Sequence, residues 1–320
     1  MKVLIHDLTQ NELNTLLPKI SNDIKIISNN GTIEKCIGCF SCWIKTPCRC
    51  ILKDNYRNLG SLYSKCDEII ILTRCCYGCY SPFIKNVLDR SINYILPYFT
   101  MRNNEMHHTS RYKNKFKLSV YAYGENITDE EKETMKELVT ANVINFNARA
   151  GILPIRSLET LNSSDAIVFA FPLYVDSLPS HFLRFLEALE IYFKSNENHN
   201  IRVYAISNCG FYEGEQNRIA LKIIENWCHK CNLIFAQGLG IGGGPVANEF
   251  PNVELGHAIK KDIGLAINTL CINILNDGVC SNIYASINFP KRLYIFEGNN
   301  SWTAVAKKNG LKKKDICSLE

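Results

Sequence analysis

Short apolar runs alternate with longer amphipathic stretches along most of this chain. The clearest example is a run that follows Asp165 and ends at Phe171, then a loop with Pro172 and Tyr174, then an amphipathic stretch from Pro179 onward. A nearly continuous apolar run is typical of a strand buried on both faces of a parallel sheet, and the amphipathic stretch predicts a helix. In such a sheet the loop lies at the carboxyl ends of the strands, where open α/β sheets bind ligands.

The same order occurs earlier in the chain. An apolar run over 66–74 predicts a strand, residues 75–82 form its loop, and residues 83–98 predict a helix. Each of the two copies continues in the same way, with a strand that ends in a Gly-containing loop and then a helix. These later elements are expected at 117–126 and 129–148 in the first copy, and at 201–210 and 213–231 in the second.

The duplicated order predicts two related α/β halves, residues 1–150 and residues 151–320. The first half begins with two further strands, over 1–5 and 23–28. The second half has no corresponding pair, because the segment 150–157 leads almost directly to its first predicted strand. We therefore expect the second half to be abbreviated.

A glycine-rich segment over 238–243 contains the letters G-x-G-x-x-G after a predicted strand at 232–237. The dinucleotide-binding fingerprint requires the first strand of a βαβ unit and a helix that starts among the glycines. Here the strand comes late and Pro245 follows, so we interpret the segment as a flexible turn. A helix is expected beyond it, over 255–275.

The composition is that of an ordinary globular protein, with 46% hydrophobic and 21% charged residues. The net charge of +5 is spread along the 320 residues apart from a lysine-rich stretch at 307–314, so we expect no nucleic-acid partner. No segment is long and apolar enough to span a bilayer, and the first apolar run ends at His6, too early for a signal peptide. These features predict a cytoplasmic protein without a membrane partner.

Fifteen cysteines are present, and nine of them precede residue 80. In a chain of this size without a secretion signal, clustering indicates metal or redox chemistry more than a disulfide framework. The densest run has Cys36, Cys39 and Cys42 at intervals of three, followed by Cys48 and Cys50. Such a run suits an iron–sulfur cluster, because cluster irons need several thiolates that converge from one loop. Zinc and a plain turn without metal are the alternatives.

These motifs resemble the NADPH-dependent FMN reductase and iron–sulfur flavoprotein group. The resemblance rests on Cys-x-Gly-Cys-Phe-x-Cys-Trp at 36–43, Leu-Asp-Arg at 88–90, Phe-Pro-Leu-Tyr at 171–174 and Asn-Cys-Gly-Phe-Tyr-Glu at 208–213. It covers most of residues 1–245. It implies a flavodoxin-like fold, with helices on both faces of a parallel sheet and FMN at the carboxyl edge. The implied activity moves electrons from NAD(P)H to a small-molecule or protein acceptor.

The resemblance also implies a set of site residues. The flavin itself carries hydride transfer, so no catalytic side chain is named. A homodimer is expected because that family commonly dimerises. The residues expected to bind FMN are Tyr77, Gly78, Pro172, Leu173, Tyr174, Val175, Asp176, Asn208, Cys209, Gly210, Phe211 and Glu213. The residues expected to hold a [4Fe–4S] cluster are Cys36, Cys39, Cys42 and Cys50.

The chain departs from that family where the FMN phosphate would bind. Family members use a loop rich in Ser, Thr and Gly, with backbone N–H groups that face the phosphate. Here the segment after the first strand, His6–Glu12, carries acidic residues that would repel a phosphate. Three functions stay open: an FMN-dependent NAD(P)H oxidoreductase, an FMN and iron–sulfur electron-transfer protein, and a cofactor-free binding module. The first is the leading hypothesis.

Overall fold

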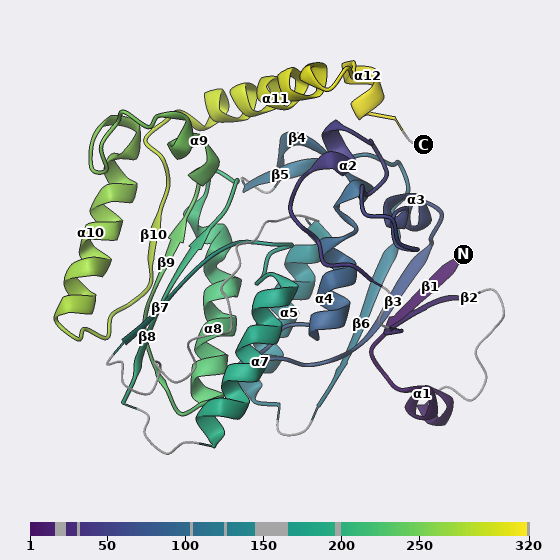
Figure 1. The fold of residues 1–320 in the computed structure, drawn as a ribbon, viewed down its shortest axis with the longest axis horizontal. Helices are drawn as coiled ribbons and strands as arrows, with labels where there is room; N and C mark the ends of the chain where they lie inside the picture. The colour runs from purple at the N-terminus through teal and green to yellow at the C-terminus, as the bar shows by residue number, and fades with distance from the viewer. Residues whose placement is uncertain are drawn as a thin grey trace. The chain divides into compact units, whose positions relative to one another are not determined.

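The computed structural model describes residues 1–16, 24–30, 33–102, 105–124, 127–144, 166–195 and 200–318. The chain forms two compact units (Figure 1). Unit 1 comprises Met1–Thr100, His108–Asn147 and Phe296–Glu320, and unit 2 comprises Met101–His107 and Ala148–Ile295. The C-terminal segment therefore belongs to the same unit as the start of the chain. The predicted division between residues 150 and 151 lies outside the described residues.

Unit 1 contains a four-stranded parallel sheet in the order β2 (Ile24–Ser28), β1 (Lys2–His6), β3 (Glu68–Arg74) and β6 (Lys117–Tyr123). The chain moves from β1 outward to β2, then returns past β1 to β3 and β6. This reversal creates a switch point between the carboxyl ends of β1 and β3, which is where open α/β sheets bind ligands.

Strand β1, inside the sheet of unit 1, is buried on both faces. Val3, Leu4 and Ile5 of β1 point alternately to the two faces, and none of them is more than 2% exposed. Leu4 packs in one cluster with Leu8 and with Leu13 of helix α1. The helical segments that lie wholly in unit 1 are α1 (Gln10–Leu16), α2 (Ser41–Ile44), α3 (Leu59–Tyr63), α4 (Pro82–Asp89), η1 (Ile92–Tyr94), α5 (Asp129–Ile144) and α12 (Lys313–Ile316).

The helix predicted over 83–98 is wrong beyond Asp89. Helix α4 ends there, and the chain continues through η1 into a strand, β4 (Ile95–Arg102), which pairs with β5 (Glu105–Ser110). Pro97 cannot continue a helix and disfavours helical backbone at the residue before it. The indole N–H of Trp43 also donates to the carbonyls of Ile92 and Ile95, at 3.0 and 2.9 Å.

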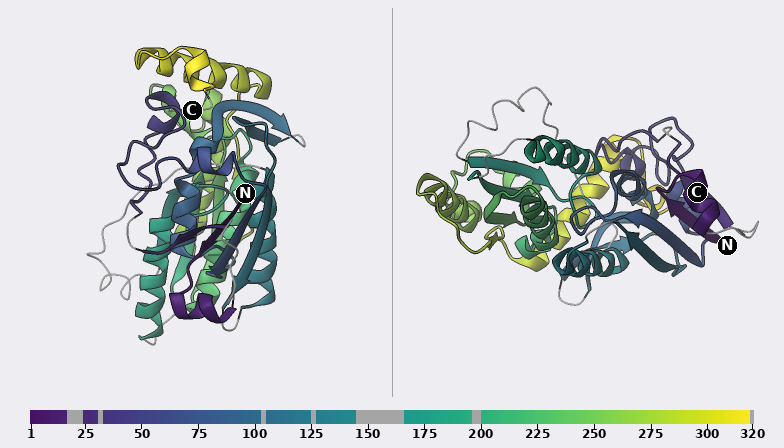
Figure 2. Two further views of the ribbon diagram at one scale, coloured as in Figure 1. Left: turned by 90° about the vertical axis from the view of Figure 1, so that its right-hand side faces the viewer. Right: turned by 90° about the horizontal axis from the view of Figure 1, so that it is seen from below.

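Unit 2 contains a second parallel sheet, in the order β7 (Ala166–Pro172), β8 (Arg202–Asn208), β9 (Ile234–Ile241) and β10 (Ile283–Ala285). The repeat in the sequence matches β7 to β3 and β8 to β6. Within the described part of unit 2, no strand lies beside β7 to match β1 or β2. The α/β fold in two related parts is confirmed, with a parallel sheet in each (Figure 2).

The prediction that the first strand of the second copy is buried on both faces is wrong. Strand β7 alternates between buried and exposed residues, and Val168 is 44% exposed. The reason is that β7 is an edge strand of its sheet. The helical segments of unit 2 are α7 (Ser180–Lys194), η2 (Gly214–Asn217), α8 (Arg218–Lys230), α9 (Gly244–Glu249), η3 (Ala258–Lys260) and α10 (Lys261–Leu275); α11 (Lys291–Lys308) begins in unit 2 and ends in unit 1.

The predicted flexible turn at 238–243 is also wrong, because β9 extends through Gly238 and Gly240 to Ile241. These glycines are places where another segment lies against the backbone. A Cβ on Gly240 would lie 2.6 Å from the Gly214 carbonyl oxygen, and one on Gly242 would lie 2.2 Å from that of Tyr212. The glycines therefore permit close packing of the segment 212–214 on the sheet.

The two copies share an unusual turn after their first strand. Cys76 and Cys79 are bridged across Tyr77 (φ 60°) and Gly78 (φ 82°). In unit 2, Tyr174 and Ser177 are bridged in the same way across Val175 (φ 44°) and Asp176 (φ 57°). Positive φ at both central residues defines a type I′ hairpin turn, so the duplication extends to backbone conformation.

None of the described helices combines the length and the apolar character needed to cross a membrane.

The turn at Gly78 should be intolerant of a side chain. A Cβ there would lie 2.6 Å from Thr134 Cβ of helix α5, and the backbone φ of +82° is itself unfavourable for other residues. We expect Gly78→Ala to lower the free energy of unfolding by about 1–3 kcal/mol more than the control Gly310→Ala. Gly310 has a similar φ of +77°, but a Cβ there would meet nothing within 4 Å. Denaturant unfolding of both variants measures the difference; equal losses would contradict the packing of α5 on this turn.

Candidate functional site

The cysteine-rich loop lies in unit 1, between β2 and α3. Gly38 (φ 62°) and Phe40 (φ 50°) adopt left-handed backbone conformations that turn the chain between successive cysteines. Cys42 is buried in the short helix α2, Cys36 and Cys50 are half-buried, and Cys39 is exposed. The loop therefore has an inner side and a side that faces solvent.

Four thiols of this loop are electrostatically coupled. Burial raises the pKa of the Cys42 thiol, and negative charge on Cys36, Cys50 and Cys39 raises it further. Burial also raises the pKa of Cys36 to about 12, with a contribution from the Asp89 carboxylate and a smaller one from Cys50. The four cysteines that the sequence analysis selected thus lie in one loop, between β2 and α3.

Cys48, the alternative fourth cysteine, lies in a different environment. Its buried thiol donates to the Ser318 carbonyl oxygen at 3.0 Å, and its own carbonyl accepts from Asn93 at 2.8 Å. Cys50 instead donates its backbone N–H to the Arg57 carbonyl, and the Arg57 Nε donates to the Cys50 carbonyl. Among the two, Cys50 is the residue whose charge acts on Cys42.

Aromatic packing anchors the inner side of the loop. The rings of Phe40 and Trp43 stack with centroids 4.9 Å apart, and the edge contact from Trp43 to Trp302 spans 5.4 Å. Trp43 is 1% exposed. Because this stack lies between Cys39 and the end of α2, it holds the backbone that carries Cys42.

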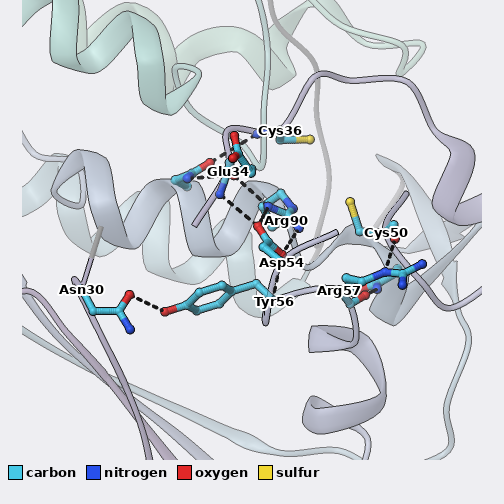
Figure 3. A network of polar contacts seen from close by, with 10 residues as sticks. Asn30, Glu34, Cys36, Cys50, Asp54, Tyr56, Arg57 and Arg90 are labelled. Atoms are coloured by element: carbon cyan, nitrogen blue, oxygen red, sulfur yellow. Dashed lines mark hydrogen bonds and ion pairs between the residues drawn. The ribbon is translucent and has the colours of Figure 1, made fainter. Parts of the chain in front are cut away.

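A buried ion pair closes the two ends of the loop (Figure 3). Arg90, at the end of α4, donates to both carboxylate oxygens of Asp54 at 2.7 and 2.8 Å, and also to the Glu34 carbonyl at 2.8 Å. Asp54 accepts further bonds from the backbone N–H groups of Glu34 and Tyr56. The Arg90 and Asp54 side chains are 0% and 8% exposed. Residues 34 and 54 flank the cysteines, so this one pair fixes both ends of the loop.

The Arg90 guanidinium also faces the thiols. Burial opposes its charge, but Asp54 and Cys50 outweigh that effect and raise the pKa of Arg90. Its Nε–H has no hydrogen-bond partner among the described residues. In Figure 3 the sulfur atoms of Cys36 and Cys50 lie on the same side of the ion pair. Arg90 therefore carries a buried donor without a hydrogen-bond partner among the described residues, and its charge interacts with Cys50.

A second buried guanidinium, Arg111, lies near Cys42 and lowers the pKa of that thiol against the effect of burial. Arg111 is 6% exposed, and its printed partners in the described chain are backbone carbonyl oxygens, including those of Asn93 and Ile316. A buried charge is normally paired with an opposite charge. The region around Cys42 thus carries more positive than negative charge while the thiols are protonated.

The described residues contain no group of three or more His, Cys, Asp or Glu side chains arranged to hold a single metal ion. Tetrahedral zinc with bonds of about 2.3 Å needs thiolates about 3.8 Å apart. A four-iron cluster separates its thiolates further, because each thiolate binds a different iron. The thiols of this loop, as they lie in the described residues, therefore form no site for a single zinc ion.

The switch point of unit 1 is occupied by a carboxylate. Asp7 accepts hydrogen bonds from the Arg74 N–H at 2.9 Å and the Tyr123 hydroxyl at 2.8 Å. Thr9 and Glu12 form a reciprocal capping box at the start of α1, which uses the N–H groups that a phosphate would need. This edge of the sheet does not fit the phosphate of FMN.

Two of the residues expected to bind FMN, Tyr77 and Gly78, lie in the type I′ turn of unit 1. Both are buried, and Gly78 contacts Glu131 and Thr134 of helix α5. Helix α5 therefore occupies the space over the backbone of this turn, where an isoalloxazine ring would lie.

The other ten residues expected to bind FMN lie in unit 2, on two adjacent loops. Pro172 is opposite Asn208 at the ends of β7 and β8, and the Leu173 N–H donates to the Asn208 carbonyl at 2.8 Å. The structure thus brings the two loops together. The turn itself is closed, since Tyr174 is 1% exposed and Val175 is 0% exposed.

The second loop is held by contacts within unit 2. Glu213 forms an ion pair with Lys291 and accepts from the Met106 N–H at 3.3 Å. Burial raises the pKa of the Cys209 thiol to about 12. These side chains are used for structure, and no part of the described loop offers a phosphate cradle.

Two residues of the cysteine site were missed by the sequence analysis, Asp54 and Arg111. Asp54 precedes β3 in the sequence, and its partner Arg90 follows β3. Arg111 follows β5, a strand that the sequence analysis did not predict. No local pattern marks either residue. Arg90 was the one available signal. It follows a buried helical face, where an unpaired cation would be costly, and so indicates that an acidic partner lies elsewhere in the chain.

No protein-family model matches the chain, and searches of curated proteins and of solved structures also find no match. The fold and the site alone define its class, a two-part α/β protein with a parallel sheet in each part and a loop of four coupled thiols.

Breaking the buried ion pair should destabilise the protein strongly. Arg90→Met leaves the Asp54 carboxylate buried without its counter-ion, and we expect a loss of about 3–5 kcal/mol in the free energy of unfolding. The control is Lys132→Met, which removes the exposed pair with Asp129 and should cost no more than about 1 kcal/mol. Similar losses in the two variants would rule out the proposed role of the buried pair.

The same pair predicts a pH dependence. Burial raises the pKa of Asp54, but hydrogen bonds from Arg90, Glu34 and Tyr56 outweigh it and lower the pKa below the usual value. A carboxyl group whose pKa is lower in the folded than in the unfolded protein stabilises the fold at pH values above its unfolded pKa. This stabilisation is lost as the pH falls through the folded-state pKa. The stability gap between wild type and Arg90→Met should therefore narrow below about pH 4.

Proposed function

We propose that this chain is an electron-transfer protein that carries a [4Fe–4S] cluster on Cys36, Cys39, Cys42 and Cys50. The observation that carries this proposal is that Cys36, Cys39, Cys42 and Cys50 lie in one loop whose two ends, at Glu34 and Asp54, are both bound by the buried Arg90 side chain. Four cysteines in one loop are the ligand set that such a cluster needs.

Charge balance supports the proposal. Cluster binding requires four thiolates, and thiols with a raised pKa must lose their protons to the medium when the cluster assembles. Arg90 and Arg111 are buried cations that would stabilise these thiolates. The unpartnered Nε–H of Arg90 is a donor available to a thiolate or to a sulfide of the cluster.

When bound, the cluster supplies one-electron transfer. The protein residues decide where electrons can leave. Cys42 and the aromatic stack close the inner side, whereas Cys39 is exposed and Ile37 is 65% exposed. We infer that electrons pass through the side of Cys39 to a small-molecule or protein acceptor. All fifteen cysteines are thiols, which supports a reducing compartment such as the cytoplasm.

A second candidate function is an FMN-dependent NAD(P)H oxidoreductase. The observation that favours it is the backbone of Val175, a β-branched residue at φ 44° in the turn after β7. Such strain collects at functional sites. The described residues do not fit the phosphate of FMN, so we derive no step through a flavin.

The cluster proposal predicts the iron content of reconstituted protein. Wild type incubated anaerobically with iron and sulfide should bind about four irons per chain and show a broad absorbance lost on reduction. Cys42→Ser and Cys39→Ser should each lose most of this iron, because a hydroxyl is a poor ligand for it. Iron and acid-labile sulfide are measured on the same samples.

The matched control is Cys48→Ser, in the same loop. Its serine hydroxyl can still donate to the Ser318 carbonyl, so this variant should keep the iron content of wild type. Wild type that binds no iron would reject the cluster, and loss of iron in Cys48→Ser would reject the ligand assignment.

The flavin candidate predicts a particular specificity. Because the structure has no phosphate cradle in its described part, riboflavin and FMN should bind with affinities within about threefold of each other. Tyr174→Ala should weaken both equally. Quenching of flavin fluorescence measures the affinities. A strong preference for FMN would reveal a phosphate site, and absence of binding by either flavin would reject this candidate.

A further inference from the structure

The turn after β3 carries a second thiol site, separate from the cysteine-rich loop. Cys76 and Cys79 flank the turn, and each donates its backbone N–H to the carbonyl of the other at 2.8 Å. They are bridged as an antiparallel pair across Tyr77 and Gly78. Both are thiols in this structure.

This arrangement meets the main geometric condition for a disulfide. Residues that exchange both hydrogen bonds across an antiparallel pair have Cα atoms about 5.5 Å apart, and disulfides span about 4.4–6.8 Å. Their side chains point to the same face, with Cβ atoms toward the upper end of about 4.5–5.5 Å, because the shorter separations belong to pairs that are not hydrogen-bonded. A disulfide needs about 3.5–4.5 Å between Cβ atoms, so the bond would close with a local shift of about 1 Å.

We propose that Cys76 and Cys79 form a redox-active dithiol that exchanges with low-molecular-weight disulfides. The shift required for closure strains the oxidised form, and strained disulfides are the ones that are easily reduced. The ring also encloses only the two turn residues, so the bond would stabilise the fold little. The pair is therefore suited to reversible oxidation and not to structural cross-linking. This inference does not rest on the proposed cluster.

The assignment is specific to these two cysteines. Cys75 is adjacent in sequence, but successive residues of an extended strand point to opposite faces. The Cys75 N–H donates to the Tyr123 carbonyl at 2.8 Å, which continues the ladder of the sheet. In unit 2 the same turn carries Tyr174 and Ser177, so the matching position has no thiol pair.

The reaction balances with one equivalent of a small disulfide. A thiolate of the pair attacks glutathione disulfide, which forms a mixed disulfide and releases one glutathione thiolate. The second thiolate of the pair attacks the protein sulfur of the mixed disulfide and releases the second glutathione. Two protein thiols are oxidised to one disulfide, and one glutathione disulfide is reduced to two thiols.

Burial controls the rate of this exchange. Cys76 is 3% exposed and Cys79 is 0% exposed, and Gly78 between them contacts Thr134 of α5. Thiols in such surroundings react slowly. The informative quantity is therefore the position of equilibrium, after long incubation, and not the initial rate.

The experiment equilibrates the full-length protein in buffers with increasing ratios of oxidised to reduced glutathione. Remaining thiols are then blocked with N-ethylmaleimide, and the tryptic peptide 75–85, which carries all three cysteines of this segment, is weighed by mass spectrometry. We expect the peptide to change from three blocked cysteines to one, with the loss of two hydrogen atoms. Cys75→Ser should form the same disulfide.

Cys76→Ser and Cys79→Ser should each lose the intrapeptide disulfide. Denaturant unfolding of each variant shows whether it is folded, and wild type and Cys75→Ser alone suffice if either is not. Three blocked cysteines in wild type at every ratio would overturn the proposal. A stable glutathione adduct as the end product, or a disulfide that persists in Cys79→Ser, would overturn it as well.

Discussion

The cysteine site of unit 1 depends on the buried ion pair between Arg90 and Asp54. Asp54 accepts bonds from the guanidinium and from two backbone N–H groups, and Arg90 also reaches the Glu34 carbonyl. A buried charge without its partner costs several kcal/mol, so neither residue can be exchanged alone without moving the loop. This pair holds both ends of the loop, and so it fixes the backbone that carries the cysteines.

The charges in unit 1 differ between the places expected for the two cofactors that the sequence suggests, an iron–sulfur cluster and FMN. Around Cys42 the buried groups include two cations, of which Arg90 is paired with the Asp54 carboxylate and Arg111 lowers the pKa of Cys42. At the switch point of the sheet the group is Asp7, a carboxylate. Two like unit charges 4 Å apart repel by about 4 kcal/mol at an effective dielectric constant of 20. A phosphate would carry more than one such charge, so this edge of the sheet disfavours a nucleotide phosphate.

The two copies of the strand–turn–helix unit preserve backbone geometry and differ in side chains. Both turns have positive φ at their two central residues, although only Gly78 is suited to that conformation and Val175 is not. Unit 1 has thiols at the bridged positions, whereas unit 2 has Tyr174 and Ser177. The two copies therefore share this backbone turn and differ in the side chains that it carries.

The sequence by itself determined the α/β class, the strands β1, β2, β3 and β6 of one sheet and β7 to β9 of the other, the repeated order of elements, and the four clustered cysteines. Apolar periodicity and cysteine spacing are local signals, so they can be recognised without the fold. The tertiary structure decided the rest. The strand at Ile95–Arg102, the burial of Gly238 and Gly240 in β9, and the exposure of Val168 depend on distant partners or on an edge position. Asp54 and Arg111 reach the cysteine loop through contacts across many residues, and no local pattern records such contacts.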